Sequence, residues 1–383
     1  MFVGSDEIAF KIRGVISTQC PALDLVLGRG GFPLGRLTIV YGKEGSGKTT
    51  LVLHALAECQ AMGGVAVLID KEYALDPPYA AAVGVNIERL IISQDGSLED
   101  AFRLMNSVID RVVEFRQRTG RRVPAMIALD SINACLGQAT INADEDDAVI
   151  GVESRIWSRN LPKLLKRAYH EDIALVFISQ VRTKINVMFG DPNDIAGGNA
   201  PKFYASILLQ VQPTGASRET AGGEKTTGED KDAIKVGYMA FAEAKKNRIA
   251  PPFRKANFLL RYGKGVDFNY SLLAVAVDHG IIDKNGAWYV YNGERIGQGA
   301  IAAAKYLDAR PDVSAAINFQ FRAKMGWDYS DLDALEVPTI EHSAECLASP
   351  GECIGPPCPV GVYYEDHPGE APEASGVAEL VEE

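Results

Sequence analysis

A glycine-rich segment in the first part of the chain fits the pattern G-x-x-x-x-G-K-S/T, which is typical of loops that surround phosphate groups. Glycine lets backbone N–H groups turn toward phosphate oxygens, and a helix starting after the segment adds positive potential. Lys48 is expected to reach the β- and γ-phosphates of a nucleotide, and the Thr49 hydroxyl to bind Mg²⁺. A chance glycine-rich turn is the alternative, but the strand before the segment and the helix after it match the context that the motif requires. The predicted phosphate-binding residues are Gly42, Lys43, Glu44, Gly45, Ser46, Gly47, Lys48, Thr49 and Thr50.

Carboxylates that could serve this site follow two apolar runs. Asp130 ends the run Met126–Asp130, and at the carboxyl end of a strand it would face the crevice where Mg²⁺ binds. An ordinary turn acid at a strand end is the alternative for Asp130. A further carboxylate should orient or deprotonate the attacking water. Asp70 and Glu72 both lie at the end of the run Gly64–Asp70, and their chemistry alone does not choose between them.

Between residues 36 and 180, short apolar runs alternate with segments that have helical spacing of apolar residues. Continuous apolar runs are typical of strands buried on both faces, and their alternation with helices indicates a parallel sheet covered on both sides. The predicted fold class is therefore α/β with a mostly parallel central sheet. The predicted strands are Arg36–Tyr41, Gly64–Asp70, Leu90–Ser93, Pro124–Asp130 and Ala174–Gln180, and the predicted helices are Lys48–Met62, Leu98–Arg116 and about 151–169.

The second half of the chain is less regular. Residues 181–201 combine glycine, proline and apolar residues and are predicted to form a mobile loop. Residues 213–233 contain mainly glycine, threonine and charged residues, which predicts the flexible tip of a hairpin. Residues 267–325 predict a small α/β unit with turns at Asn285-Gly286 and Asn292-Gly293. The further strands predicted here are Ser206–Val211, Lys235–Ala242 and Phe258–Tyr262.

Composition narrows the class of protein. The chain has 383 residues, of which 47% are hydrophobic and 23% charged, so it can build a core and is neither collagen-like nor wholly disordered. Its length favours about two or three domains. No run approaches the roughly 18 apolar residues of a membrane-spanning helix, and the first residues lack the apolar stretch of a signal peptide. We therefore expect a cytoplasmic protein without a membrane partner.

The end of the chain differs from the rest. Residues 331–383 contain 13 acidic residues and no Lys or Arg, which leaves 37 acidic and 39 basic residues in the remainder. This proline-rich tail is predicted to be disordered; it would either aid solubility or compete with an anionic ligand for a basic groove. Its three cysteines and the nearby His342 could bind zinc, but their spacing fits no familiar zinc site, so free thiols are the preferred interpretation. These residues are His342, Cys346, Cys353 and Cys358.

Several long segments together resemble the RecA family of DNA recombinases. The resemblance extends from about Ile16 to about Asp312, in the order that the family has. The segments are LIDKEYALDPPYAAAVGV, ISQVRTKINVMFGDP, GGNAPKFYAS, KKNRIAPPF and GAWYVYNGERIGQG. Members encoded by bacteria and by bacteriophages are not separated by these motifs.

The resemblance implies a role in ATP hydrolysis for individual residues. Glu72 matches the family's catalytic glutamate, and Gln180 matches the glutamine that senses the γ-phosphate. Asp76 and Tyr79 match residues beside the adenine. The pair Lys246 and Arg248 matches cations that reach the ATP of a neighbouring subunit, so that hydrolysis would depend on assembly; a solvated charge pair is the alternative.

The resemblance also implies two DNA-binding loops. Arg182 and Lys184 would meet phosphates in the second loop, where Ile185 takes the place of an apolar wedge between bases. Residues 197–199 would offer N–H and amide donors to phosphates. The first loop is less typical, because acidic residues 143–147 precede its family-like part. The predicted DNA-binding residues are Ile150, Gly151, Arg155, Arg182, Lys184, Ile185, Gly197, Gly198 and Asn199.

The chain departs from the family at places assigned to a second DNA site. Basic residues are usual there, but this chain has Leu208, Gln212, Phe241 and Glu243. Binding of the first DNA strand is therefore better supported than capture of a duplex. Only about 15 residues precede the family-like part, where typical members have a longer arm for polymerisation.

Taken together, these features predict an ATP- and Mg²⁺-dependent recombinase that forms helical filaments on single-stranded DNA and pairs it with homologous duplex DNA. The protein would act in DNA repair and in the SOS response. The alternatives are a hexameric helicase of related fold and a filament-forming DNA-binding protein with little hydrolysis. The expected domains are an N-terminal segment at 1–15, an ATPase core at 16–266, a small C-terminal α/β domain at 267–330 and the acidic tail at 331–383.

Overall fold

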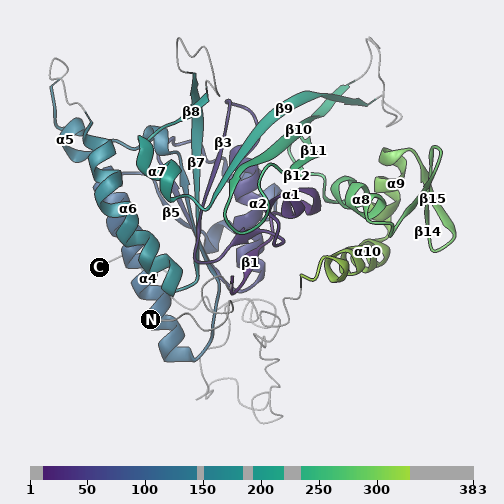
Figure 1. Ribbon diagram of the computed structural model, residues 1–383, viewed down its shortest axis with the longest axis horizontal. Helices are drawn as coiled ribbons and strands as arrows, with labels where there is room; N and C mark the ends of the chain where they lie inside the picture. Colours follow the sequence, from purple (N-terminus) through teal and green to yellow (C-terminus); the bar gives the residue numbers. More distant parts are fainter. Residues whose placement is uncertain (1–11, 145–150, 184–192, 220–233, 328–383) are drawn as a thin grey trace, which may run out of the picture. The chain divides into compact units, whose positions relative to one another are not determined.

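A computed structural model describes residues 12–144, 151–183, 193–219 and 234–327 (Figure 1). The described residues all belong to one compact unit. Several predictions lie outside the described residues, namely those for Ile150, Lys184, Ile185 and the acidic tail with its candidate zinc ligands. The expected domain boundaries stay predictions.

Ten strands form the main sheet. They are β3 (Leu37–Gly42), β4 (Val65–Asp70), β5 (Ile91–Ser93), β6 (Ala125–Asp130), β7 (Ile173–Thr183), β8 (Asn193–Ile195), β9 (Ile207–Glu219), β10 (Ile234–Asn247), β11 (Lys255–Arg261) and β12 (Gly265–Val266). Their order is β12-β11-β10-β9-β3-β7-β6-β4-β5, and β8 pairs with the end of β7. The run from β9 to β5 is parallel, whereas β10, β11 and β12 extend it antiparallel. The predicted α/β class is confirmed.

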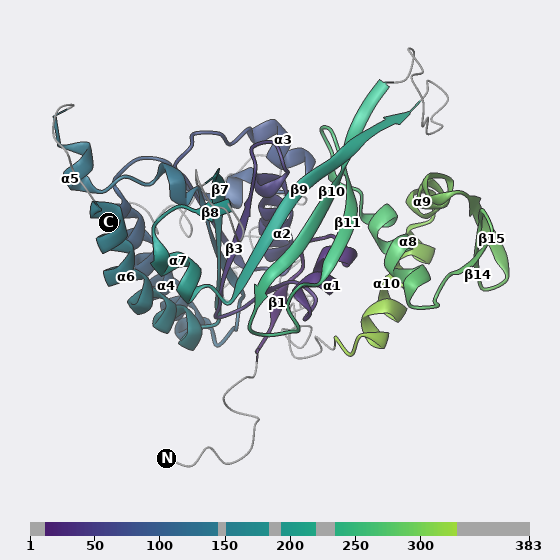
Figure 2. The same ribbon diagram turned by 45° about the horizontal axis from the view of Figure 1, so that its top comes forward.

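Helices cover both faces of this sheet. They are α1 (Pro21–Leu27), α2 (Lys48–Ala61), α3 (Pro77–Ala82), α4 (Leu98–Thr119), α5 (Gln138–Ile141), α6 (Val152–His170) and α7 (Asn199–Tyr204), with short 3₁₀ turns at Ile87–Arg89 and Ile132–Ala134. Both views place α4 and α6 side by side on one face and α2 on the other (Figures 1 and 2). Because successive strand residues point to opposite faces, Ile39 packs with the α4/α6 side and Val40 with the α2 side. Trp157 of α6 is fully buried between Phe102 and Phe177, with ring centroids 5.1 and 5.9 Å away.

The C-terminal part contains α8 (Phe268–Asp278), α9 (Ala300–Ala309), α10 (Pro311–Lys324) and a three-stranded sheet of β13 (Asp283–Asn285), β14 (Trp288–Tyr291) and β15 (Glu294–Gln298). The predicted turns are present: Gly286 and Gly293 join the strands, and Asn292 and Gly293 both have positive φ. Leu272 and Phe321 belong to the same hydrophobic cluster as α2. A separate small sheet pairs β1 (Val15–Ile16) with β2 (Phe32–Pro33).

The prediction of loop structure was wrong at both ends of 181–201 and at the start of 213–233. β7 continues to Thr183, β8 returns beside it, and α7 begins at Asn199. β9 continues to Glu219, paired with β10. Glycine and charged residues suggested turns here, but pairing along the backbone of two antiparallel strands satisfies the N–H and C=O groups whatever the side chains are.

Candidate nucleotide site and nucleic-acid segments

The phosphate loop joins β3 to α2 and depends on close backbone packing. A Cβ atom on Gly42 would lie 2.1 Å from the Val211 carbonyl oxygen, and one on Gly47 would lie 2.4 Å from a Leu260 methyl. Gly47 has φ of +90° and directly precedes the first residue of α2. Only glycine meets both demands, because other residues carry a Cβ and avoid this backbone conformation. The loop therefore brings the N-terminus of α2 to the carboxyl end of β3.

Polar groups inside the loop are suited to an anion. The Ser46 hydroxyl is buried and has no hydrogen-bond partner within the described part of the chain. Lys48 is buried too, and its ammonium donates to the Lys43 carbonyl at 2.8 Å. Burial lowers the pKa of Lys48, whereas Asp130 and Glu72 favour its charged form. A buried cation and an unpaired hydroxyl at a helix N-terminus fit phosphate oxygens.

The predicted metal ligands meet at the next strand ends. The Thr49 hydroxyl donates to the Asp130 carboxylate at 2.6 Å, joining the first turn of α2 to the end of β6. Asp130 is 4% exposed, and burial raises its pKa to about 6 against the lowering effect of the Thr49 hydrogen bond. A hydroxyl oxygen and a carboxylate oxygen in contact are the ligand types that Mg²⁺ prefers, so these residues fit the ion.

The structure distinguishes the two acids at the end of β4. The Asp70 carboxylate accepts hydrogen bonds from the backbone N–H groups of Glu72, Ala74 and Leu75 and from the Gln94 amide. Its oxygens are thus occupied in holding the turn after the strand. Glu72 instead points toward the ends of β6 and β7, where it contacts Ser131 and Gln180.

Glu72 is held by two polar side chains from neighbouring strands. The Gln180 amide nitrogen lies 3.1 and 3.3 Å from its two carboxylate oxygens, and the Ser131 hydroxyl donates to it as well. The structure thus brings together the predicted water-activating acid and the predicted phosphate sensor. Sequence reasoning missed Ser131, although its place directly after Asp130 was a usable signal.

Gln180 is fixed from behind by Asn133. The side-chain amide oxygen Oδ1 of Asn133 accepts from the Gln180 backbone N–H and from the Ser179 hydroxyl, both at 2.9 Å. The Ser179 oxygen accepts from the Ala196 N–H at 3.3 Å, which ties β7 to β8. Sequence reasoning missed this cluster because its members are far apart in the chain.

The predicted adenine residues lie beside α2. Asp76 caps α3 by accepting from the Tyr79 N–H, and the Tyr79 hydroxyl is 2.8 Å from the Thr50 hydroxyl. Tyr238 was not predicted, but its hydroxyl would be 3.0 Å from a Cβ on Gly47. Burial raises the pKa of Tyr238 to about 12, helped by the nearby Tyr79. These tyrosines provide aromatic and hydroxyl groups close to the phosphate loop.

The cation pair Lys246 and Arg248 contacts α7, whereas Lys48 contacts the phosphate loop. Lys246 donates to the carbonyls of Lys202 and Phe203 at 2.8 and 2.9 Å, and Arg248 donates to the Phe203 carbonyl at 3.1 Å. Burial, with the charge of Arg248, lowers the pKa of Lys246 to about 8. The pair therefore lies at the end of the helix that begins at Asn199.

The described parts of the two predicted DNA loops lie against each other. Gly198 directly precedes α7 with φ of +77°, and a Cβ there would lie 2.8 Å from the Ser154 hydroxyl. Ser154 is in the first turn of α6, which Gly151 precedes with φ of +72°. Its neighbour Arg155 is exposed. Of Arg182 the structure describes the backbone, which belongs to β7.

The four departures from the family's second DNA site lie on β9 and β10. Gln212 pairs across the strands with Phe241. Glu243 is 7% exposed and forms an ion pair with Lys245 at 2.7 Å. Leu208 packs against the cluster on the α4/α6 side. At positions where the family was expected to have cations, Leu208 thus packs against apolar side chains and Glu243 pairs with Lys245 of the same strand.

The site consists of a phosphate loop between a parallel strand and a helix, a threonine–aspartate pair, and a glutamate held at a neighbouring strand end. These features define an ATPase of the phosphate-loop class. Two models of known protein families match the sequence and make the class of ATPase more specific. The model of the RecA N-terminal domain matches residues 1–267, and that of the RecA C-terminal domain matches residues 270–326. The chain belongs to the RecA family.

Two similar proteins, both named Protein RecA, agree with this assignment. Protein RecA of Thioalkalivibrio sulfidiphilus is 40% identical over 319 residues, covering 83% of this chain and 87% of that protein. Protein RecA of Streptococcus sanguinis is 40% identical over 312 residues, covering 82% and 77%. The crystal structure of the RadB recombinase is similar with a TM-score of 0.47 and 23% identity, over 66% of this chain and 98% of that one.

Membership of this family makes the chain a DNA recombinase and a DNA-dependent ATPase, as the sequence predicted. Within the described helices, none is both long and apolar enough to cross a bilayer.

Proposed function

We propose that this protein binds ATP with Mg²⁺ at the phosphate loop, assembles into helical filaments on single-stranded DNA, and exchanges strands with homologous duplex DNA. The observation that carries the proposal is the contact of Glu72 with Gln180, one strand away from the Thr49–Asp130 pair. We further propose a cytoplasmic role in DNA repair, including the SOS response. The relatives named Protein RecA support this setting.

In hydrolysis, Lys48 and the loop N–H groups would hold the β- and γ-phosphates. Thr49 and Asp130 would hold Mg²⁺, which neutralises charge on the phosphates when it is bound. Glu72 would orient the attacking water and take its proton. Asp76 and Tyr79 would lie beside the adenine. Lys246 and Arg248 would act on the ATP of a neighbouring subunit, which makes hydrolysis depend on assembly.

Gln180 would connect hydrolysis with DNA binding. Its amide bonds Glu72 here, and the same amide can turn to a γ-phosphate oxygen when ATP is bound. The backbone that follows Gln180 leads toward the predicted second DNA loop. There Arg182, Lys184 and residues 197–199 would contact DNA phosphates, and Ile185 would separate bases. Ile150, Gly151 and Arg155 would contribute from the first loop.

A substitution at Glu72 tests the proposal. Glu72→Gln keeps the size of the side chain but removes the base, so we expect ATP binding within about twofold of the original affinity and turnover reduced at least about a hundredfold. ATPase rates would be measured with and without single-stranded DNA, and strand exchange with a homologous duplex. Glu88→Gln is the matched control on an exposed turn. Unchanged turnover in Glu72→Gln would remove Glu72 from the mechanism.

A further inference from the structure

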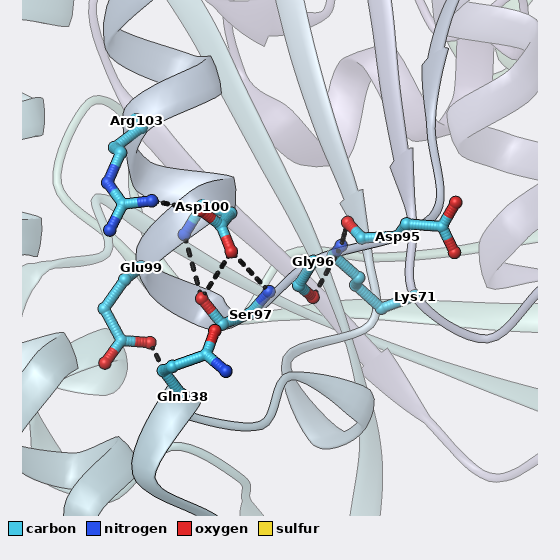
Figure 3. Close-up of polar contacts among 8 residues, drawn as sticks. All are labelled: Lys71, Asp95, Gly96, Ser97, Glu99, Asp100, Arg103 and Gln138. Carbon is cyan, nitrogen blue, oxygen red and sulfur yellow. Dashed lines mark hydrogen bonds and ion pairs between the residues drawn. The ribbon is translucent and has the colours of Figure 1, made fainter. Parts of the chain in front are cut away.

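Lys71 directly precedes Glu72, yet it belongs to no motif identified in the sequence. Its side chain is buried, with 9% of the residue exposed. The ammonium donates to three successive backbone carbonyls, those of Gln94 at 3.0 Å, of Gly96 at 3.1 Å, and of Asp95 between them. Figure 3 shows the contacts with Asp95 and Gly96. An ammonium has three N–H donors, so the three carbonyls of residues 94–96 satisfy all of them.

The acceptors resemble those of a small cation site. Backbone carbonyls that converge on one point replace the water shell of a monovalent cation such as K⁺. Here the cation is attached to the chain as Lys71. Burial lowers the pKa of Lys71, while the nearby Asp95 and Asp100 favour its charged form. We call the carbonyls of residues 94–96 the carbonyl cage.

The carbonyl cage is built on a fixed helix end. Gly96 has φ of +88°, which turns the chain so that the carbonyls converge. Ser97 and Asp100 then cap α4 reciprocally: the Ser97 N–H and hydroxyl donate to the Asp100 carboxylate at 2.9 and 2.7 Å, and the Asp100 N–H donates back at 3.2 Å (Figure 3). The Leu98 N–H donates to the Leu136 carbonyl at 2.7 Å. The cage is therefore an anchor and not a free loop.

Contacts on both sides of Glu72 join its segment to this anchor. The Tyr73 hydroxyl donates to the Asp95 carboxylate at 3.0 Å, and the Gln94 amide donates to the Asp70 carboxylate at 3.1 Å. Both sequence neighbours of Glu72 thus reach toward residues 94–96. Glu72 itself reaches the other way, to Gln180. Its carboxylate is positioned by neighbours that are held from the opposite side.

We propose that Lys71 is a positioning residue for hydrolysis: a tethered cation that fills the carbonyl cage and so holds Glu72 toward Gln180 and the phosphate loop. The proposal rests on the proposed role of Glu72. It has a chemical consequence, because shortening Lys71 leaves the cage open to a free monovalent cation. The free ammonium ion carries the same kind of N–H donors as the lysine head group, with one more of them, and is the probe of choice.

The test compares Lys71→Ala with Lys71→Met in the full-length protein. Both variants should lower kcat for DNA-stimulated ATP hydrolysis about tenfold, the effect expected of a group that orients a catalytic residue, with KM for ATP changed less than about twofold. Ammonium chloride should restore most of the lost kcat in Lys71→Ala and none in Lys71→Met, whose longer side chain fills the space. Tetramethylammonium chloride, which is too large for the cage, is the salt control.

Two results would overturn the proposal: wild-type kcat in a folded Lys71→Met, or equal effects of both salts on Lys71→Ala. If the Lys71 variants do not fold, Gly96→Ala tests the cage from its exposed side. A Cβ at Gly96 would lie 3.0 Å from the Asp100 Cβ, and the φ of +88° is strained for alanine, so the substitution disturbs the turn that forms the cage. The same loss of kcat is expected, and unchanged kcat would refute the proposal. Failure of Glu72→Gln to lower turnover would instead refute the proposed function.

Discussion

His54 makes the stability of the fold sensitive to acid. It lies on α2 and is 5% exposed. Its Nε2 accepts the Val266 N–H at 2.9 Å, so this nitrogen carries no proton, and Nδ1 donates to the side-chain amide oxygen Oε1 of Gln19 at 2.9 Å. A Cβ on Gly265 would lie 2.2 Å from Nε2, so the Gly265 backbone packs closely against the His54 ring. A proton added to Nε2 would face the Val266 N–H at hydrogen-bond distance.

The size of the change in stability follows from the pKa of His54. Burial lowers the pKa of His54 from 6.5 to about 4. The unfolded chain therefore binds a proton more readily than the folded one between these values, and stability that is present above pH 6.5 is lost as the pH falls toward 4. Between pH 8 and pH 5 the free energy of unfolding should fall by about 2 kcal/mol from His54 alone.

Urea unfolding of the wild type and of His54→Gln at pH 8 and pH 5 measures the contribution of His54 to the pH dependence of stability. The variant is suitable because the glutamine amide oxygen can accept the Val266 N–H without titrating. The difference between the proteins is needed, since burial also raises the pKa of Asp24 to about 7. The ionisation of Asp24 therefore lowers the free energy of unfolding by about 2 to 3 kcal/mol as the pH rises from 5 to 8. This change is opposite in sign to that from His54. Identical pH dependence in both proteins, or a His54 pKa near 6.5 by NMR titration, would refute the reasoning.

Three further predictions concern the site. Asn133→Ala removes the acceptor of the Gln180 N–H, so unfolding should become easier by about 1 to 3 kcal/mol in urea and DNA should stimulate the ATPase less; full stimulation would contradict this. Thr49→Val loses the hydroxyl that contacts Asp130, so kcat should fall at least about tenfold and the need for Mg²⁺ should rise, whereas Thr49→Ser should retain both. Burial lowers the pKa of Lys246 to about 8, so the ATPase rate should fall above pH 8 and Lys246→Arg should shift that fall to higher pH; an unshifted profile would exclude Lys246 as its cause.

The sequence predicted the parts of the fold that burial makes conspicuous. β3, β4 and β6 are almost wholly apolar before their last residue because both faces are covered, and each ends at a residue of the site: Gly42, Asp70 or Asp130. Parallel strands bring these ends to one edge, so the phosphate loop and its acids could be placed together without coordinates. The extension of β9 to Glu219 could not be predicted, since pairing of backbones leaves no pattern in polar side chains.

The parts of the site that were not predicted depend on contacts between distant segments. Asn133 and Lys71 are ordinary residues in the sequence. Their roles depend on partners 47 and 23 to 25 positions away, several of them backbone groups that look alike in every sequence. Chemistry at the end of β4 also could not choose between Asp70 and Glu72. The resemblance to the RecA family selected Glu72, and the structure adds a physical reason: backbone N–H groups occupy the Asp70 carboxylate, whereas Gln180 reaches Glu72.

The arrangement of β7 explains how nucleotide and DNA could affect each other without a long pathway. Gln180 contacts Glu72 by its side chain, while one residue later Val181 pairs with Ile195 of β8. Two residues beyond Ile195 the chain reaches Gly197, whose Cβ position would lie 2.9 Å from an Ile132 methyl beside the Asp130 strand end. A shift of the β7 backbone would therefore affect the predicted nucleotide contact and the predicted DNA segment together. If ATP strengthens DNA binding, DNA strengthens ATP binding by the same factor, because such coupling is reciprocal.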